Sequence, residues 1–114
     1  MDQRMEQWAI QVKKGVLQLC LMALLKGKEV YGYQLTSEME KRSGGGMMLS
    51  EGTVYPLLRR MEREGLVASR WKESDSGPPR RYYTLTENGV KMHEEMLKEW
   101  GRYIASCQKI LEMV

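Results

Sequence analysis

Basic side chains gather in the segment between Arg59 and Arg81. The chain carries eighteen basic and fifteen acidic residues, and this segment holds seven of the basic ones against four acidic ones, which leaves eleven of each sign elsewhere. A locally basic face is the electrostatic signature of a surface that binds phosphate groups. A solvated helix face followed by a charged turn would have the same composition, so charge alone leaves both interpretations open. The seven basic residues are Arg59, Arg60, Arg63, Arg70, Lys72, Arg80 and Arg81.

Patterns for catalysis or metal binding do not stand out in the sequence. The chain has one histidine, and neither Cys20 nor Cys107 has a second cysteine or a histidine at metal-ligand spacing. The glycines at positions 44–46 are not a phosphate loop, because no strand precedes them and no Lys-Ser or Lys-Thr pair follows. We therefore predict no metal and no cofactor, and we treat a small enzyme as the most remote of three candidate functions.

A predicted helix from Ser50 to Leu66 positions the first part of the basic segment. Ser50 is a good N-cap, and Gly65 is suited to end the helix. Pro56 deep inside a helix would remove a hydrogen bond and clash with the preceding turn. We therefore expect the regular helix to begin near Thr53 or Val54, or to bend there. The residues expected to face inward are Val54, Leu57, Leu58 and Met61.

Two short strands, Leu66 to Trp71 and Arg81 to Thr86, are predicted to form a hairpin after this helix. The connection from Ser74 to Pro79 is rich in turn residues, and we expect it to be long and mobile. A helix with a basic outer face followed by a basic hairpin is the layout of a winged helix-turn-helix, which places one helix in the major groove of DNA and the hairpin along the backbone. Alternation puts Tyr83 and Leu85 on one face and Tyr82 and Thr84 on the other.

Two predicted helices precede this unit. The first has a single apolar face from Met5 onwards, and from Val16 it is apolar on nearly every side until Gly27, so we expect its second half to be buried. The second is predicted from Gly32 to Arg42, with Leu35 and Met39 facing the core and glycines closing it.

The last predicted helix begins after a Thr86 cap and continues to Val114 with a heptad-like apolar seam. A helix of this length with such a seam needs a partner, and a homodimer is the economical answer. The fold class is therefore α+β and mostly helical, with a DNA-binding domain over residues 1–86 and a dimerisation helix over residues 87–114. The predicted interface residues are Val90, Leu97, Trp100, Ile104, Cys107 and Leu111.

The compartment is predicted to be the cytoplasm. Both cysteines lie in apolar surroundings, which suits buried free thiols in a reducing compartment. No secretory signal opens the chain, and the apolar run Val16–Leu25 is too short to cross a bilayer.

Three segments resemble the PadR family of transcriptional regulators. They are Val30–Leu35 (VYGYQL), Ser50–Val67 (SEGTVYPLLRRMEREGLV) and Arg80–Gly89 (RRYYTLTENG). The length suits the short subfamily with a single C-terminal helix. The resemblance implies a winged-helix homodimer that represses transcription. A two-fold dimer would bind an inverted-repeat operator in double-stranded DNA. In many relatives a small phenolic or multi-ring aromatic compound relieves that repression. The competing function is a winged-helix protein–protein adaptor that binds neither DNA nor an effector.

The predicted DNA contacts lie on the third helix, at the start of the second helix and on the wing. Base edges and phosphates would be contacted from the first half of the third helix, although Tyr55 would also suit half-buried packing. The wing charges would also suit simple solubility, and Tyr31 and Tyr33 could pack across the domain, which we favour for Tyr33. The predicted DNA-binding residues are Tyr31, Ser50, Thr53, Tyr55, Arg59, Lys72, Arg80 and Arg81.

Trp100 on the seam could stack on a planar aromatic effector at the dimer interface, with Trp8 as a second aromatic. A closed aromatic core pair is the alternative. Methionines would form adaptable walls. His93 is expected on the helix surface or seam, with no catalytic role. The predicted effector-binding residues are Met5, Trp8, Met92, Met96 and Trp100.

Overall fold

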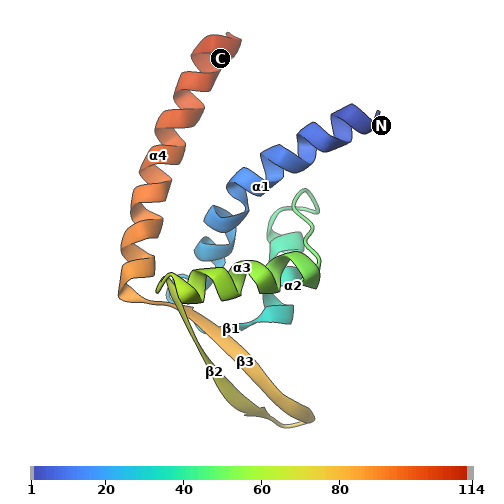
Figure 1. Ribbon diagram of the computed structural model, residues 1–114, viewed down its shortest axis with the longest axis vertical. Helices are drawn as coiled ribbons and strands as arrows, with labels where there is room; N and C mark the ends of the chain where they lie inside the picture. Colours follow the sequence, from blue (N-terminus) through green and yellow to red (C-terminus); the bar gives the residue numbers. More distant parts are fainter. Residues whose placement is uncertain (1, 113–114) are drawn as a thin grey trace.

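The computed structural model describes residues 2–112, and this part of the chain contains four helices and a small three-stranded sheet, whose hairpin projects from one end of the molecule (Figure 1). This is the predicted mostly helical winged helix-turn-helix. The outer half of α1 and the length of α4 project away from the wing formed by β2 and β3. The elements are α1 (Gln3–Leu25), β1 (Val30–Tyr31), α2 (Gly32–Arg42), α3 (Glu51–Arg63), β2 (Val67–Ser74), β3 (Gly77–Leu85) and α4 (Glu87–Leu111).

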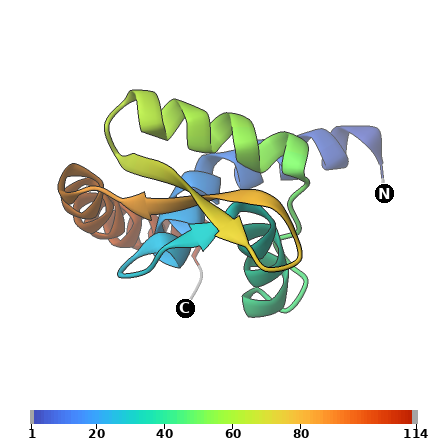
Figure 2. The same ribbon diagram turned by 90° about the horizontal axis from the view of Figure 1, so that it is seen from below.

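The sheet has the order β1-β3-β2, and both pairings are antiparallel. Figure 2 shows α3 on one side of the hairpin and β1 on the other. Strand β1 was not predicted, because two residues carry no periodicity. Tyr31 opens α2 as its N-cap, as expected, and it also pairs with Tyr82 of β3, while Val30 pairs with Tyr83.

The wing is longer than predicted and its tip is tighter. The strands continue to Ser74 and from Gly77, so the turn is confined to residues 75–76 and does not span Ser74–Pro79. The register shifts between the pairs Lys72–Arg80 and Ser74–Gly77, which sets Pro78 and Pro79 opposite a single residue of β2. A bulge tolerates prolines because its extra residue does not take part in the ladder of hydrogen bonds.

Helix α3 begins at Glu51, two residues before the expected start. The carbonyl of Ser50 accepts hydrogen bonds from the backbone N–H groups of Thr53 and Val54, at 3.0 and 3.1 Å. Pro56 consequently lies in the second turn, where it removes one backbone donor without ending the helix. Burial of one face holds this first part of the helix against the core. The fully buried residues of that face are Val54, Leu58 and Met61, as predicted, with Leu57 partly buried.

The hydrophobic core lies between the inner half of α1, the inner faces of α2 and α3, and the base of the hairpin. The prediction that α1 is buried from Val16 onwards is confirmed by six buried residues between Leu17 and Leu25, and Leu35 and Met39 of α2 are buried as expected. By length and composition alone α1 could also cross a membrane. Packing into this core accounts for the apolar character of its inner half, whereas Trp8, Ile10 and Val12 of the outer half are exposed.

The start of α4 is tied to the corner between α3 and β2. The Thr86 hydroxyl donates to the Gly65 carbonyl at 2.6 Å and accepts from the backbone N–H of Gly89 at 3.0 Å, which confirms Thr86 as the N-cap. A Cβ at Gly89 would lie 2.0 Å from the Leu66 carbonyl oxygen, so only glycine permits this approach. The helix ends at Leu111 with Glu112 as a left-handed C-cap, so the predicted continuation towards Val114 is wrong at Glu112, and residues 113–114 lie outside the described part of the chain.

His93 is buried against the body of the domain, which contradicts its expected place on the helix surface or seam. Its side chain is 2% exposed, and neither ring nitrogen has a hydrogen-bond partner among residues 2–112. Burial lowers the pKa of His93, and the charge of Lys26 acts in the same direction. Folding therefore favours the neutral form of the ring.

We predict that His93→Leu removes a pH-dependent part of the stability. The pKa of His93 is lowered from 6.5 on folding, so its contribution is fully present above pH 6.5 and is lost as the pH falls below that value. The loss is at most about 1.4 kcal/mol for each pH unit. Urea unfolding between pH 8 and pH 5 should show that decline in the wild type and not in the variant.

His93 is the single histidine of the chain, so no other imidazole titrates between pH 8 and pH 5 in the wild type or the variant. At pH 8 the variant should be at least as stable, because it no longer buries an unpaired polar ring. Parallel stability curves for the two proteins from pH 8 to pH 5 would contradict the prediction.

Candidate nucleic-acid interface

A concave surface lies between α3 and the wing, and we call it the α3–wing pocket. It has a volume of about 360 Å³, and it combines aromatic rings with guanidinium groups. Five of the eight residues predicted to contact DNA lie here. The lining residues are Tyr31, Gly32, Tyr55, Arg59, Trp71, Pro79, Arg80, Arg81 and Tyr83.

Tyr55 packs against the first residue of α2. A Cβ at Gly32 would lie 2.5 Å from the Tyr55 hydroxyl oxygen, so glycine at this position makes room for the ring. Tyr55 is half-buried, and burial together with the charge of Glu51 raises its pKa. Its phenol therefore stays protonated and forms a wall of the pocket, which is the packing role that the sequence left open.

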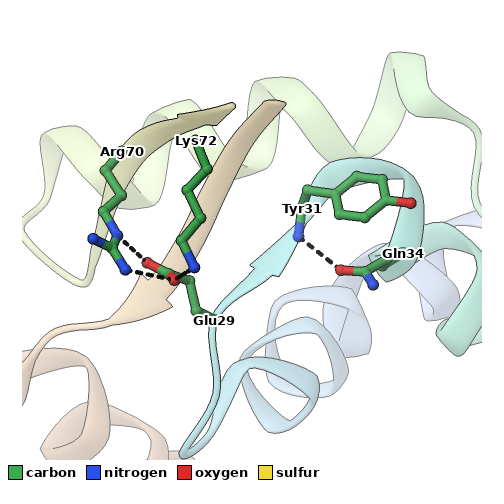
Figure 3. A network of polar contacts seen from close by, with 5 residues as sticks. All are labelled: Glu29, Tyr31, Gln34, Arg70 and Lys72. Carbon is green, nitrogen blue, oxygen red and sulfur yellow. Dashed lines mark hydrogen bonds and ion pairs between the residues drawn. The ribbon is translucent and has the colours of Figure 1, made fainter. Parts of the chain in front are cut away.

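Tyr31 joins β1, α2 and the wing. Its backbone N–H donates to Gln34 Oε1 at 3.2 Å at the start of α2 (Figure 3). Its ring stacks on Tyr33 and meets Tyr82 edge-on, at centroid distances of 6.5 and 5.4 Å. The guanidinium of Arg80 lies 4.6 Å from the Tyr31 ring centroid. Tyr33 is 62% exposed, so the packing favoured for it is limited to the stack on the Tyr31 ring.

The arginines around the pocket fall into two groups. Arg59 and Arg80 form no ion pair or side-chain hydrogen bond with any of residues 2–112. Arg81 instead donates to Glu62 Oε1 at 3.2 Å and to Ser69 Oγ at 2.9 Å. Arg60 lies elsewhere on α3 and donates to Gln18. Among the described residues that line the pocket, the cations without an acidic partner are thus Arg59 and Arg80.

Lys72 belongs to a separate cluster on the face of β2 opposite Trp71 (Figure 3). Glu29 accepts two hydrogen bonds from Arg70, at 2.6 and 3.0 Å, and pairs with the ammonium group of Lys72. These contacts, with Arg70 first, lower the pKa of Glu29 to about 2. Lys72 also lies over the Tyr82 ring. Its charge is largely committed to holding the wing against the loop before β1.

Ser50 and Thr53 lie outside the pocket at the exposed start of α3. Their hydroxyl groups are 3.2 Å apart. Both are free of the core, so the first turn of α3 presents two small polar side chains beside the basic pocket.

A second hollow, the α1–α4 groove, has a volume of about 610 Å³. Of the predicted effector-binding residues, Met96 and Trp100 line it. Met5 and Trp8 lie further out on α1 and are about half exposed, and Met92 lines a different shallow hollow. Most of the wall was not predicted from the sequence, because the groove depends on how α1 crosses α4. The added residues are Gln11, Val12, Gly15, Val16, Leu19, Glu99 and Tyr103.

The predicted seam of α4 divides between this groove and solvent. Ile104 and Cys107 line the groove within one chain, whereas Leu97 and Leu111 are 44% and 64% exposed. Tyr103 and Ile110, which the heptad pattern did not include, are also exposed. The outer half of α4 therefore carries apolar side chains on more than one face of the helix.

Residues 21–95 match the family model described as the transcriptional regulator PadR-like family. A PadR family transcriptional regulator from Eggerthella lenta superposes with a TM-score of 0.85 at 29% identity over 96% of this chain and 94% of that one. A PadR-like transcriptional regulator from Bacillus cereus gives 0.77 at 36% identity over 91% and 99%. PadR from Bacillus subtilis, in complex with operator DNA, gives 0.66 at 27% identity over 72% and 46%. The chain belongs to the PadR-like family of transcriptional regulators.

Proposed function

We propose that the protein is a sequence-specific DNA-binding repressor. The observation that carries this is the pair of unpaired guanidinium groups, Arg59 and Arg80, on the two sides of the aromatic α3–wing pocket. Charges left without acidic partners on a concave surface are suited to phosphate groups. The likeness to Bacillus subtilis PadR, whose structure contains operator DNA, supports the same function.

In this proposal α3 enters the major groove and the wing lies along the backbone. Ser50 and Thr53 reach base edges from the exposed first turn, while Arg59 and Arg80 bind phosphates on either side. Tyr31 and Tyr55 position these groups by packing. Lys72 binds phosphate at the wing with the part of its charge that Glu29 does not neutralise. The protein would act in the cytoplasm and would have no enzyme activity.

We propose further that the active form is a homodimer joined through α4, with the DNA-binding part in residues 1–86. Exposed apolar side chains on the outer half of α4 lose contact with water when a second copy covers them. A two-fold dimer places two copies of α3 on an inverted repeat, with half-sites about one helical turn or a multiple of it apart.

A planar aromatic effector is proposed to bind in the α1–α4 groove. Trp100 and Tyr103 offer faces for stacking, and Val12, Val16 and Met96 supply adaptable apolar walls. Such a ligand relieves repression if it binds best to a dimer geometry in which the two copies of α3 no longer match successive major grooves.

The DNA-binding proposal predicts that Arg59→Ala together with Arg80→Ala weakens binding to all duplexes. Each lost phosphate contact should lower the slope of log affinity against log salt by about 0.9, so the double variant should lose about 1.8. The measurement is fluorescence anisotropy with a duplex selected from a random pool, over a series of salt concentrations.

The matched control is Arg4→Ala with Arg42→Ala, which removes the same charge from exposed sites outside the pocket. The control should keep the wild-type slope. Equal slopes in all three proteins would exclude this interface, and the absence of any selected duplex would favour the adaptor function.

The dimer proposal predicts that Leu97→Glu yields a folded monomer at micromolar concentration. Leu97 is 44% exposed in the single chain, so a charge there costs little until a second copy buries it. Sedimentation velocity measures the association state, and circular dichroism measures folding. Met48→Glu, at a 58% exposed position away from α4, should remain dimeric. A monomeric wild type would refute the proposal.

The effector proposal predicts that planar aromatic dyes quench tryptophan fluorescence and that Trp100→Ala abolishes most of this quenching. DNA affinity without dye should stay within a few-fold, because Trp100 and the α3–wing pocket lie on different elements. Trp71→Phe removes the background signal from the wing and should leave dye binding intact. Equal quenching by the wild type and Trp100→Ala would place the dyes elsewhere.

A further inference from the structure

Three side chains from α3, β2 and β3 form one closed set of hydrogen bonds. Ser69 donates to Glu62 Oε2 at 2.6 Å, and Arg81 donates to Glu62 Oε1 at 3.2 Å and to Ser69 Oγ at 2.9 Å. We call this set the Glu62–Ser69–Arg81 triad. Both carboxylate oxygens are used, and the Ser69 hydroxyl both donates and accepts. The guanidinium of Arg81 also lies over the Trp71 ring, 5.7 Å from its centroid.

The triad connects the two elements that must contact DNA together. Glu62 is near the end of α3, while Ser69 and Arg81 lie diagonally across the two strands of the wing, because Ser69 pairs with Tyr83, two residues away from Arg81. Backbone pairing fixes the strands relative to each other but does not fix the hairpin relative to the helix. A bridge of directional, charge-assisted hydrogen bonds between helix and hairpin restricts that angle.

We propose that Arg81 is a positioning residue rather than a phosphate anchor, and that the Glu62–Ser69–Arg81 triad sets the angle between α3 and the wing so that both meet DNA at once. The inference rests on the proposed DNA binding and assigns different roles to adjacent arginines. Arg80 has no acidic partner among residues 2–112 and stays available to phosphate, whereas Arg81 is committed to Glu62 and Ser69.

Glu62 provides the decisive test because electrostatics and positioning predict opposite effects. Glu62 is an acidic group beside the proposed DNA surface, so removing its charge should strengthen DNA binding if it only repels phosphate. If it holds the wing in place, its removal should weaken binding. Its side chain is 30% exposed and that of Arg81 is 41% exposed, so neither substitution creates a cavity in the core.

The experiment compares Glu62→Ala with Glu62→Gln, which change the charge equally. Glutamine keeps an oxygen that accepts from Arg81, whereas alanine keeps none. We expect Glu62→Ala to bind a selected duplex about tenfold more weakly than Glu62→Gln, a coupling of about 1.4 kcal/mol. Arg81→Ala should weaken binding with the wild-type salt slope, and Arg80→Ala should lower the slope by about 0.9.

The double variant Glu62→Ala/Arg81→Ala should bind no more weakly than the worse single variant, because both changes remove the same bridge. Additive losses, equal binding by the two Glu62 variants, or a slope reduced by about 0.9 in Arg81→Ala would each overturn the proposal.

A second measurement needs no DNA. Hydrogen exchange of the wing amides should be faster in Glu62→Ala than in Glu62→Gln, while protection of the core of α1 stays unchanged. If no duplex is bound but the wing loosens as expected, the proposed DNA function fails while the triad still positions the wing. Unchanged exchange in the wing would instead refute the positioning role itself.

Discussion

The first turn of α4 packs directly on the backbone that ends α3, and the relative placement of helix, wing and long helix depends on this contact. Thr86 bonds to the Gly65 carbonyl through its hydroxyl and to the Leu66 carbonyl through its backbone N–H. Gly89 lies so close to Leu66 that no side chain fits between them. Because β3 leads straight into this turn, α4 leaves the domain in a direction fixed by the base of the wing. The hydrogen bonds of this junction therefore fix the orientation of α4, a helix of 25 residues.

Acidic residues decide which basic residues of the wing remain available. Glu29 engages Arg70 and Lys72 on one face of the hairpin, and Glu62 engages Arg81 on the other. A count of charges along the sequence treats these cations alike, but pairing separates the ones that stabilise the wing from the ones free to bind an anion. A strong anion could still compete for the paired ones, since exposed ion pairs are weak. A cation without an acidic partner can bind an anion without first breaking an ion pair.

The features that the sequence predicted correctly depend on local rules. The bounds of α2, the Thr86 cap and the burial of Leu35 and Met39 follow from helical periodicity, capping residues and glycine. Features that depend on tertiary contacts were missed. Strand β1 exists only because β3 lies beside it. The tight tip depends on a bulge that accommodates the two prolines, and His93 is buried because α4 meets the domain on that side.

The candidate sites show the same difference between features that local rules predict and features that depend on tertiary contacts. Residue type and position on a motif sufficed to find five residues of the α3–wing pocket, whereas the walls of the α1–α4 groove depend on the crossing of two helices far apart in sequence. The same limit hid the difference between Arg80 and Arg81, because adjacent residues on a strand point to opposite faces and meet different acidic partners.

The geometry also restricts how a ligand in the α1–α4 groove could release DNA. The inner half of α1 belongs to the core of the winged helix, and α4 is tied to the wing at Gly89. A ligand that pushed these helices apart near the domain would have to break the junction or the core. In the proposed dimer the less costly response is in the outer halves, where Trp8, Tyr103 and Leu111 are exposed and the second copy would dock. In this proposal a ligand there would shift one rigid protomer against the other and would change the spacing of the two α3 helices while leaving each α3–wing pocket intact.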